Sequence, residues 1–187
     1  MKLLAILGSP RKNGNSACLL DEYLKGIVKS NKDVEISKVY LHEKNIHHCN
    51  GCNICRTATP GRCVIKDDMQ ELYAQFHLSK MVVFATPVYW WSISSQLKTF
   101  LDRINAFDIS EGNYFKDKMI SVLMTYELNP PNKGPELIKA GFEEICRYTK
   151  MNLVDVYSAC TGNFSHIKED KTVLKEVHEL GSKISLY

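Results

Sequence analysis

Residues 2–16 read KLLAILGSPRKNGNS, and this stretch decides the fold. An unbroken apolar run follows Lys2 and stops at Gly8, where a short loop of small and polar residues begins. Such a run, bounded by turn residues, predicts a strand that is buried on both faces. Apolar residues then recur every three or four positions over residues 16–29, which predicts a helix. A buried strand, a polar loop and a helix in this order form the first unit of an α/β fold.

The same unit recurs along the rest of the chain. The predicted strands are residues 2–7, 34–41, 81–85, 119–124 and 153–159. The predicted helices are residues 16–29, 67–78, 94–107, 135–150 and 170–184. Strict alternation favours parallel strands joined by right-handed crossovers, with helices on both faces of the sheet. We therefore predict an α/β fold of three layers, with a five-stranded parallel sheet in the order 2-1-3-4-5.

Length and composition fit one globular domain. The chain has 187 residues, of which 44% are hydrophobic and 24% charged, so residues 1–187 are predicted to form a single domain. The net charge of +3 is too small to favour nucleic acid or a membrane surface as the partner. The first apolar run is shorter than the roughly 7–15 residues of a secretory signal core, and no segment approaches the ~18 apolar residues of a membrane span. We expect a cytoplasmic protein.

The predicted topology singles out two loops. In the order 2-1-3-4-5 the winding reverses between the first and third strands, and ligands bind beyond the carboxyl ends of the strands at such a point. These two strands are followed by residues 8–16 and 86–95. A ligand cleft is therefore predicted between these two loops.

The first loop leads directly into a helix whose N-terminal N–H groups can bind phosphate. A nucleoside-triphosphate loop needs Gly-x4-Gly-Lys, but five residues separate Gly8 from Gly14, and Asn15 stands in place of the lysine. The dinucleotide fingerprint is also missing, because Pro10 replaces its second glycine. Two interpretations remain: a site for a single phosphate group, as in a flavin mononucleotide, or a simple turn in which Asn15 or Ser16 caps the helix.

The second loop contains three adjacent aromatic residues, Tyr89, Trp90 and Trp91. Aromatic side chains in a loop are costly to expose, so they are expected to cover a planar ligand ring, a second subunit or one another. Pro87 is expected to stiffen the turn, so that backbone groups of Val88 and Tyr89 face the edge of a ring. A phosphate site at one loop and an aromatic site at the other fit a single ligand.

Three motifs follow one another along the chain. They are Gly8-Ser9-Pro10-Arg11 with Gly14-Asn15-Ser16, then Thr86-Pro87-Val88-Tyr89, then Ser95-x-Leu97-Lys98-x-Phe100-x-Asp102-Arg103. In order and spacing these motifs resemble the NADPH-dependent FMN reductase family over the whole chain. The resemblance implies a flavodoxin-like fold, non-covalent FMN, NAD(P)H as co-substrate and oxidoreductase activity.

Carried over by position, the resemblance assigns three groups of residues to the cofactor. The phosphate would be held by Ser9, Arg11, Asn13, Asn15 and Ser16. The isoalloxazine ring would be lined by Pro87, Val88, Tyr89 and Trp90. A third wall would be formed by Thr125, Tyr126 and Glu127. No catalytic acid, base or nucleophile is predicted, because the flavin carries the chemistry. Asp102 and Arg103 are predicted to pair with each other as a structural unit at a helix end.

The long connection at about residues 45–66 holds four of the seven cysteines, at Cys49, Cys52, Cys55 and Cys63. In a reducing compartment, cysteines at such spacing are more often metal-binding or catalytic than disulfide-bonded. Four thiolates can hold a [4Fe–4S] cluster or a zinc ion. The spacing resembles the iron–sulfur flavoprotein branch of the same family, although similar segments also occur in relatives not known to hold iron. The interpretation stays open between a [4Fe–4S] cluster, zinc, and free or redox-active thiols.

The predicted function is electron transfer from NAD(P)H through FMN to a small-molecule acceptor, namely a quinone, an azo or nitro compound, or free flavin. A redox protein is the other possible partner. The alternative function is that of an iron–sulfur flavoprotein, an electron carrier reduced by ferredoxin at its cysteine cluster. The aromatic loop and the resemblance together predict a homodimer or homotetramer in which one subunit helps to cover the flavin site of another. The scattered Cys18, Cys146 and Cys160 are expected to be ordinary buried residues.

Overall fold

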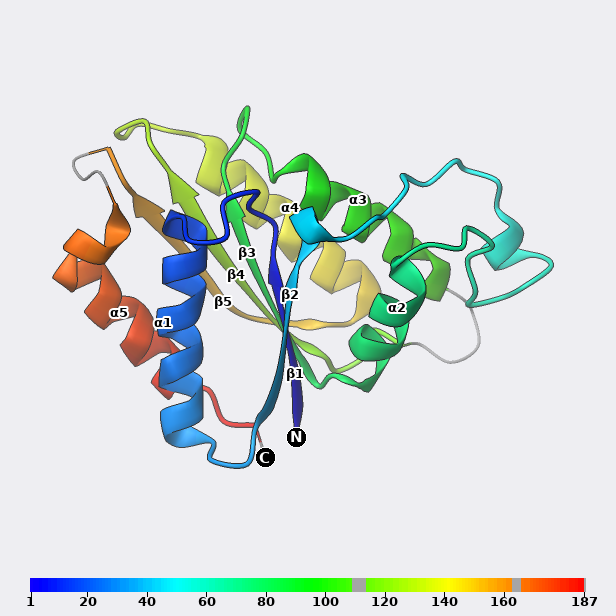
Figure 1. The fold of residues 1–187 in the computed structure, drawn as a ribbon, viewed down its shortest axis with the longest axis horizontal. Helices are drawn as coiled ribbons and strands as arrows, with labels where there is room; N and C mark the ends of the chain where they lie inside the picture. The colour runs from blue at the N-terminus through cyan, green and yellow to red at the C-terminus, as the bar shows by residue number, and fades with distance from the viewer. Residues whose placement is uncertain (109–113, 163–165, 187) are drawn as a thin grey trace.

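Five parallel strands form one sheet in the order β2-β1-β3-β4-β5, which confirms the predicted topology (Figure 1). The computed structural model describes residues 1–108, 114–162 and 166–186. The strands are β1 (Lys2–Leu7), β2 (Glu35–Tyr40), β3 (Met81–Pro87), β4 (Met119–Tyr126) and β5 (Asn152–Cys160). The second strand lies at an edge of the sheet, as the predicted strand order requires.

Two layers of helices cover the sheet (Figure 1). The helices are α1 (Asn15–Ser30), α2 (Met69–Leu78), α3 (Ser95–Ile104), α4 (Gly134–Thr149) and α5 (Lys171–Ser182). Helices α1 and α5 pack against each other on one face, and α2, α3 and α4 cover the other face. Each helix matches its prediction to within a few residues at either end. The predicted third helix is shorter because Asn105–Phe107 forms a separate 3₁₀ turn.

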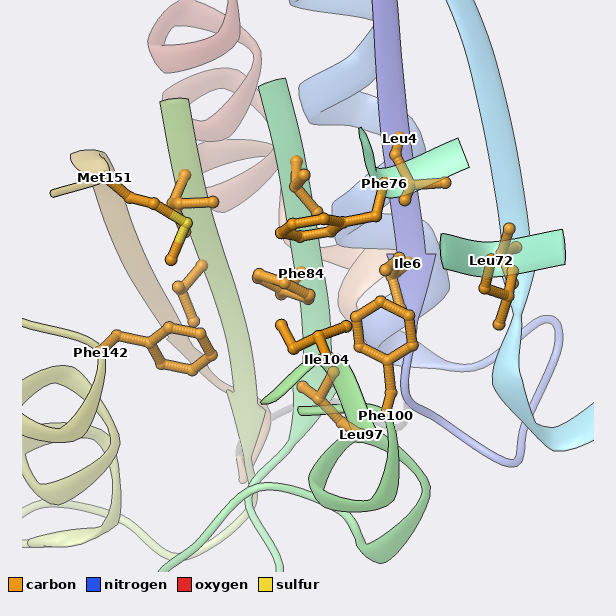
Figure 2. Close-up of a cluster of buried hydrophobic side chains, with 14 of the residues drawn as sticks. Leu4, Ile6, Leu72, Phe76, Phe84, Leu97, Phe100, Ile104, Phe142 and Met151 are labelled. Carbon is orange, nitrogen blue, oxygen red and sulfur yellow. The ribbon is translucent and has the colours of Figure 1, made fainter. Parts of the chain in front are cut away.

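The two faces of the sheet bury separate apolar cores. Along β1, Leu4 and Ile6 point toward α2, α3 and α4. The alternate residues of the strand point toward α1 and α5; they are Leu3, Ala5 and Leu7. On the larger core, Phe84 of β3 lies between Phe100 of α3 and Phe142 of α4 (Figure 2). Because both faces are covered, β1 and β3 are continuously apolar rather than alternating.

The three cysteines outside the long connection were predicted to be buried, and the structure confirms this for one of them. Cys146 is buried as expected, but Cys18 and Cys160 are only partly buried. Among the described residues, no helix combines the length and the apolar character needed to cross a membrane.

The buried side chain of Lys118 caps the C-terminal end of α2. The Lys118 ammonium donates hydrogen bonds to the carbonyls of His77 at 2.9 Å and Ser79 at 2.6 Å. Burial lowers the pKa of Lys118 to about 8. The charged form is therefore disfavoured in the folded protein relative to the unfolded chain.

Replacing Lys118 with methionine is expected to abolish a rise in stability at alkaline pH. The pKa of an exposed lysine lies near about 10.4, so between about pH 8 and that value the unfolded chain binds more protons than the folded protein. The free energy of unfolding of the wild type, relative to the variant, should therefore increase with pH across this window. Urea unfolding at several pH values measures this difference in free energy. A difference that stays constant with pH would show that burial does not lower the pKa of Lys118.

Candidate functional site

The loop after β1 is held against the third strand and helix at the point where the winding reverses. The Gly8 N–H donates to the Ala85 carbonyl at 2.8 Å. A Cβ atom at Gly8 would lie 2.9 Å from the Cβ of Leu97, so only glycine allows this approach to α3. The Ser9 side chain is buried and its Oγ accepts a hydrogen bond from the Arg11 N–H at 3.1 Å.

The N-terminal end of α1 is available to an anion. The N-cap is Gly14, and within the part of the chain that the structure describes no side chain caps this helix end. The prediction that Asn15 or Ser16 caps the helix was therefore wrong, because the helix begins at Asn15 and the side chains of both residues have other partners. The Ser16 and Thr125 hydroxyls share a buried hydrogen bond of 2.7 Å. The first-turn N–H groups of such a helix can bind a phosphate.

The outer side of this loop is fastened by a segment from the far end of the chain. The Asn15 Oδ1 accepts a hydrogen bond from the Ile167 N–H at 2.9 Å. The His166 Nδ1 accepts from the Lys168 N–H at 3.1 Å, which leaves Nε2 protonated to donate to the Asn13 carbonyl at 3.0 Å. In this arrangement Asn13 contributes its backbone and Asn15 its side-chain oxygen to holding the loop.

The remaining phosphate candidate, Arg11, is exposed. Its Cβ would lie 2.9 Å from a Cβ placed on Gly14, so it sits beside the helix end. A cation in this place is suited to a phosphate that approaches from solvent.

The aromatic loop after β3 is a tight hairpin. Tyr89 and Ser92 exchange both backbone hydrogen bonds, at 2.9 and 3.0 Å. Between them, Trp90 and Trp91 have φ angles of +49° and +58°. Two successive residues with positive φ form a type I′ turn, which normally contains Asn and Gly. The turn therefore holds Trp90 90% exposed at its tip, in a conformation that tryptophan rarely adopts.

A cavity of about 560 Å³ lies between the hairpin and the loop after β4. The two loops are joined by the Val88 N–H, which donates to the Thr125 carbonyl at 2.8 Å. The cavity is lined by Val88, Tyr89, Trp90, Trp91, Tyr126, Glu127, Leu128 and Asn132. It brings together residues predicted for the ring and for the third wall, and it has the size and apolar lining of a ligand pocket. The phosphate-loop residues are not part of its lining.

A second cavity of about 630 Å³ lies between α3 and α4. Trp91 lines both cavities. Cys49, the first cysteine of the long connection, lines this second cavity on its rim with Lys98 and Asp102. Trp91 therefore separates the predicted ring site from a groove that reaches the cysteine segment.

The four cysteines of the connection lie at the surface as free thiols. Cys49 and Cys52 are exposed, and Cys55 and Cys63 are partly buried. Burial, and then the nearby thiols of the other three, raise the pKa of Cys55. Among the described residues, however, no three metal-binding side chains lie close enough together to hold an ion. The donor set suits a soft metal or cluster in its chemistry, but the sulfurs are not gathered around one point.

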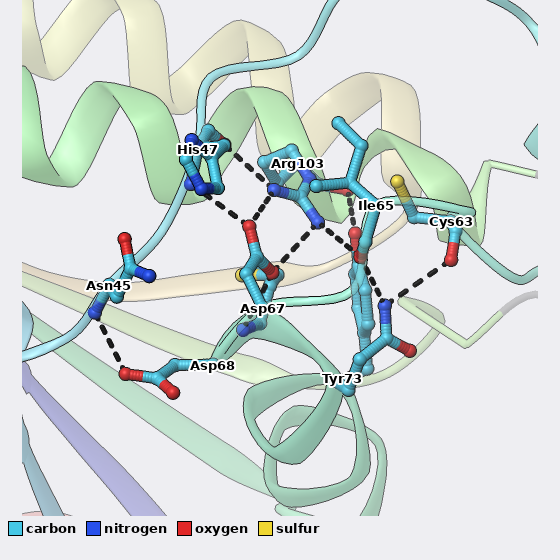
Figure 3. Close-up of polar contacts among 10 residues, drawn as sticks. Asn45, His47, Cys63, Ile65, Asp67, Asp68, Tyr73 and Arg103 are labelled. Carbon is cyan, nitrogen blue, oxygen red and sulfur yellow. Dashed lines mark hydrogen bonds and ion pairs between the residues drawn. The ribbon is translucent and has the colours of Figure 1, made fainter.

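Arg103 forms a buried ion pair that the sequence analysis did not foresee. Its Nη1 lies 2.6 Å from the Oδ2 of Asp67, and both side chains are almost fully buried (Figure 3). The predicted pairing of Asp102 with Arg103 was wrong, because neighbouring residues on a helix point in different directions. Asp102 instead pairs with Lys98, one turn earlier on the surface of α3, at 2.6 Å.

A model of the NADPH-dependent FMN reductase family matches residues 1–128. The chain belongs to this family. The matched residues contain both predicted cleft loops, all four clustered cysteines and Thr125–Glu127, so every predicted site residue lies within the FMN reductase region. The flavodoxin-like fold is likewise established.

Relatives of known description are of two kinds. An iron–sulfur flavoprotein of Archaeoglobus fulgidus is 43% identical over 104 residues, which are 56% of this chain and 46% of that protein. A Bacillus subtilis protein, described as a candidate NAD(P)H-dependent FMN-containing oxidoreductase, is 28% identical over 159 residues, 81% of each chain. The chain spans about half the length of these curated iron–sulfur flavoproteins.

Solved structures share the fold at low identity. An FMN-dependent NADH-azoreductase from Bacillus anthracis in complex with FMN has a TM-score of 0.72 at 14% identity, over 97% of this chain and 98% of that chain. An NAD(P)H:quinone oxidoreductase from Methanothermobacter marburgensis has a TM-score of 0.75 at 12% identity, over 100% of this chain and 97% of that chain. Both support the flavodoxin-like fold of this FMN reductase family member.

Several residues of the site were missed at the sequence level. Leu128 and Asn132 line the cavity and were not predicted. Trp91 was expected, as part of the aromatic run, to cover a ring, a second subunit or its neighbours, but it was not assigned to the ring site; it lines the cavity as well. His166 gave no signal in the sequence, since it lies far along the chain from the loop that it holds.

Replacing Trp90 with glycine is expected to stabilise the protein in the absence of ligand. A left-handed conformation costs a bulky residue roughly 1–2 kcal/mol, while glycine loses about 0.5–1 kcal/mol of chain entropy, so the net gain is at most about 1.5 kcal/mol. Little burial is lost, because the side chain is 90% exposed. Denaturant unfolding of the flavin-free protein measures this gain. Tyr89→Gly, at a strand-like position of the same hairpin, should be destabilising, and a less stable Trp90→Gly would disprove strain at the tip.

Proposed function

We propose that this protein is an FMN-dependent oxidoreductase that takes electrons from NAD(P)H and passes them to a small-molecule acceptor, such as a quinone, an azo or nitro compound, or free flavin. The observation that carries the proposal is the pairing of two features: the start of α1, which no described side chain caps, and an aromatic cavity between the loops after β3 and β4. Membership of the FMN reductase family and the FMN-bound azoreductase of the same fold support it.

The residues of the site fit FMN. A phosphate at the start of α1 would meet the first-turn N–H groups, with Ser9, Ser16 and Arg11 beside them. Asn13 and Asn15 would keep the loop in place through their bonds to residues 166–167. The hairpin would hold one edge of the ring and the loop after β4 the other, with Pro87 at the end of β3 and Thr125 linking the two loops.

FMN, when bound, supplies the hydride and electron chemistry. The chain itself would bind the phosphate and orient the ring. Glu127 is exposed at the cavity, and Tyr126 is half-buried there with its pKa raised by burial. These two side chains would set the polarity at the edge of the ring.

A second candidate function is that of an iron–sulfur flavoprotein, an electron carrier reduced by ferredoxin or a similar redox protein. The observation that favours it is the presence of four free cysteines on one short connection, at Cys49, Cys52, Cys55 and Cys63. Relatives named iron–sulfur flavoproteins support it. Because the sulfurs are not gathered, cluster binding at Cys49, Cys52, Cys55 and Cys63 would require the loop to close around the cluster.

An anaerobic absorption spectrum, combined with iron and acid-labile sulfide analysis, tests both functions. Flavin without iron, together with NAD(P)H oxidation, is the result expected for the first function. Flavin with four iron and four sulfide per chain, and little NAD(P)H turnover, would favour the second. A protein that neither carries nor binds flavin would disprove both.

The proposal includes a homodimer or homotetramer. Trp90 at the tip of the hairpin is 90% exposed and lies beside an apolar cavity. Burying this apolar surface against a second subunit would be more favourable than leaving it in water. Light scattering at micromolar concentration tests this, and a strictly monomeric mass with full flavin occupancy would rule out a shared site. A reducing, cytosolic location is also proposed, and the seven free thiols support it.

A further inference from the structure

The cysteines lie on a loop whose two ends are joined at a neck. We define the cysteine loop as residues 48–64 and the neck as residues 45–47 together with 65–68. Across the neck, the Asp68 N–H donates to the Asn45 carbonyl at 3.1 Å, and the Asn45 N–H donates to the Asp68 carboxylate at 2.8 Å. The His47 N–H donates to the Asp67 carboxylate at 2.9 Å. Each bond joins a residue before Cys49 to one after Cys63.

Arg103 of α3 closes this neck from the protein side (Figure 3). Its Nη1 donates to the His47 carbonyl at 2.7 Å and to Asp67 at 2.6 Å. Its Nη2 donates to Asp67 at 3.1 Å and reaches the Ile65 carbonyl at 3.4 Å. One guanidinium therefore binds both ends of the loop, two residues before the first cysteine and two residues after the last.

The burial of this contact makes it the anchor of the loop. The Arg103 and Asp67 side chains are 0% and 1% exposed, whereas the loop itself is held farther out by exposed contacts such as Arg56 with Asp108 at 2.6 Å. Exposed ion pairs contribute little, while a buried charge pair with several hydrogen bonds fixes its partners in one geometry.

We propose that Arg103 is a positioning residue for the cysteine site: by closing the neck it holds the four cysteines on one short closed loop beside α3, so that the loop has less freedom to lose when its thiols close around one thiophilic metal ion or cluster. The inference rests on the second candidate function, because only that function assigns the thiols to a metal. Its physical basis is that bringing the ends of a flexible loop together costs entropy, which a closed neck has removed before the metal binds. Outer residues that orient metal ligands typically change metal affinity by about 10- to 100-fold.

The test uses the reduced, metal-free protein and Co²⁺ as the probe, because thiolate coordination of Co²⁺ is visible by absorption. Arg103→Lys keeps a positive charge beside Asp67, but lysine lacks the planar fork needed to bind His47 and Ile65 together. We expect this variant to bind Co²⁺ about 10- to 100-fold more weakly than the wild type. Arg147→Lys is the matched control, since it is the same substitution at an exposed arginine of α4 that pairs with Glu144; it should bind Co²⁺ as the wild type does.

Hydrogen exchange of the neck provides a readout that needs no metal. The amides of His47 and Asp68 should exchange faster in Arg103→Lys and at the wild-type rate in Arg147→Lys. Should Arg103→Lys fail to fold, as judged by its thermal transition and flavin binding, Asp67→Asn replaces it, because it removes the charge that aligns the guanidinium and should act in the same direction.

The outcomes separate the inference from the proposed function. Unchanged Co²⁺ affinity in the neck variant would overturn the role of Arg103, whatever the exchange shows. If the wild type binds no Co²⁺ through thiolates, the assignment of the thiols to a metal fails. In that case exchange alone decides whether Arg103 closes the neck, and unchanged His47 and Asp68 amides would overturn it.

Discussion

Riboflavin is expected to bind this protein at least about 100-fold more weakly than FMN. Riboflavin lacks the phosphate, which in FMN would accept charge-assisted hydrogen bonds of about 1.5–3 kcal/mol each from the first turn of α1. That turn has Gly14 as its N-cap and lacks a side-chain cap among the described residues. Flavin fluorescence titration of both ligands measures the ratio. Equal affinities, or a preference for FAD, would show that the phosphate does not lie at this helix end.

A variant at the start of α1 locates the phosphate more closely. Asn15→Ala combined with Ser16→Ala should weaken FMN binding by about 1–3 kcal/mol, because it removes hydroxyl and amide groups and releases the loop from Ile167 and Thr125. Riboflavin binding by the same variant should change little. If both ligands lose affinity equally, the substitutions act on the ring site instead.

Arg103→Met is expected to lower the free energy of unfolding by about 3–5 kcal/mol, because it leaves a buried Asp67 carboxylate without its cation. The corresponding change at the neighbouring surface pair, Asp102→Asn, should cost less than about 1 kcal/mol. Denaturant unfolding at neutral pH measures both. A loss as small in Arg103→Met as in the control would mean that the buried pair does not stabilise the fold.

The same pair has a defined pH dependence. In the wild type, the hydrogen bonds and charge of Arg103 outweigh burial and hold the pKa of Asp67 below its ordinary value. A lowered carboxyl pKa stabilises the fold above the unfolded pKa of about 3.9 and loses that effect as the pH falls toward the folded value. Without the cation, burial should raise the Asp67 pKa instead, so the stability of Arg103→Met should fall as the pH rises from about 4 to 7. The gap between wild type and variant should therefore widen with pH.

Local patterns in the sequence were enough to predict the sheet and the two cleft loops. Strands such as β1 and β3 are continuously apolar, since both of their faces are buried, and turn residues bound each run. Strict alternation of such strands with helices leaves few topologies, so the strand order and the reversal point followed before any site residue was considered. The cofactor loops were found because they must lie at that point.

Contacts between residues far apart in the chain were decided only by the tertiary structure. Asp102 and Arg103 are adjacent in sequence, yet successive positions on α3 face different surroundings, so one meets Lys98 in solvent and the other meets Asp67 in the interior. Likewise, Asn15 binds a backbone amide 152 residues away, which no local pattern encodes. The paired tryptophans at the tip of a type I′ turn contradict the ordinary preference for Asn and Gly there, because neighbouring strands and loops impose the hairpin on them. Sequence periodicity thus determined which segments form the cleft, whereas packing determined which atoms each side chain touches.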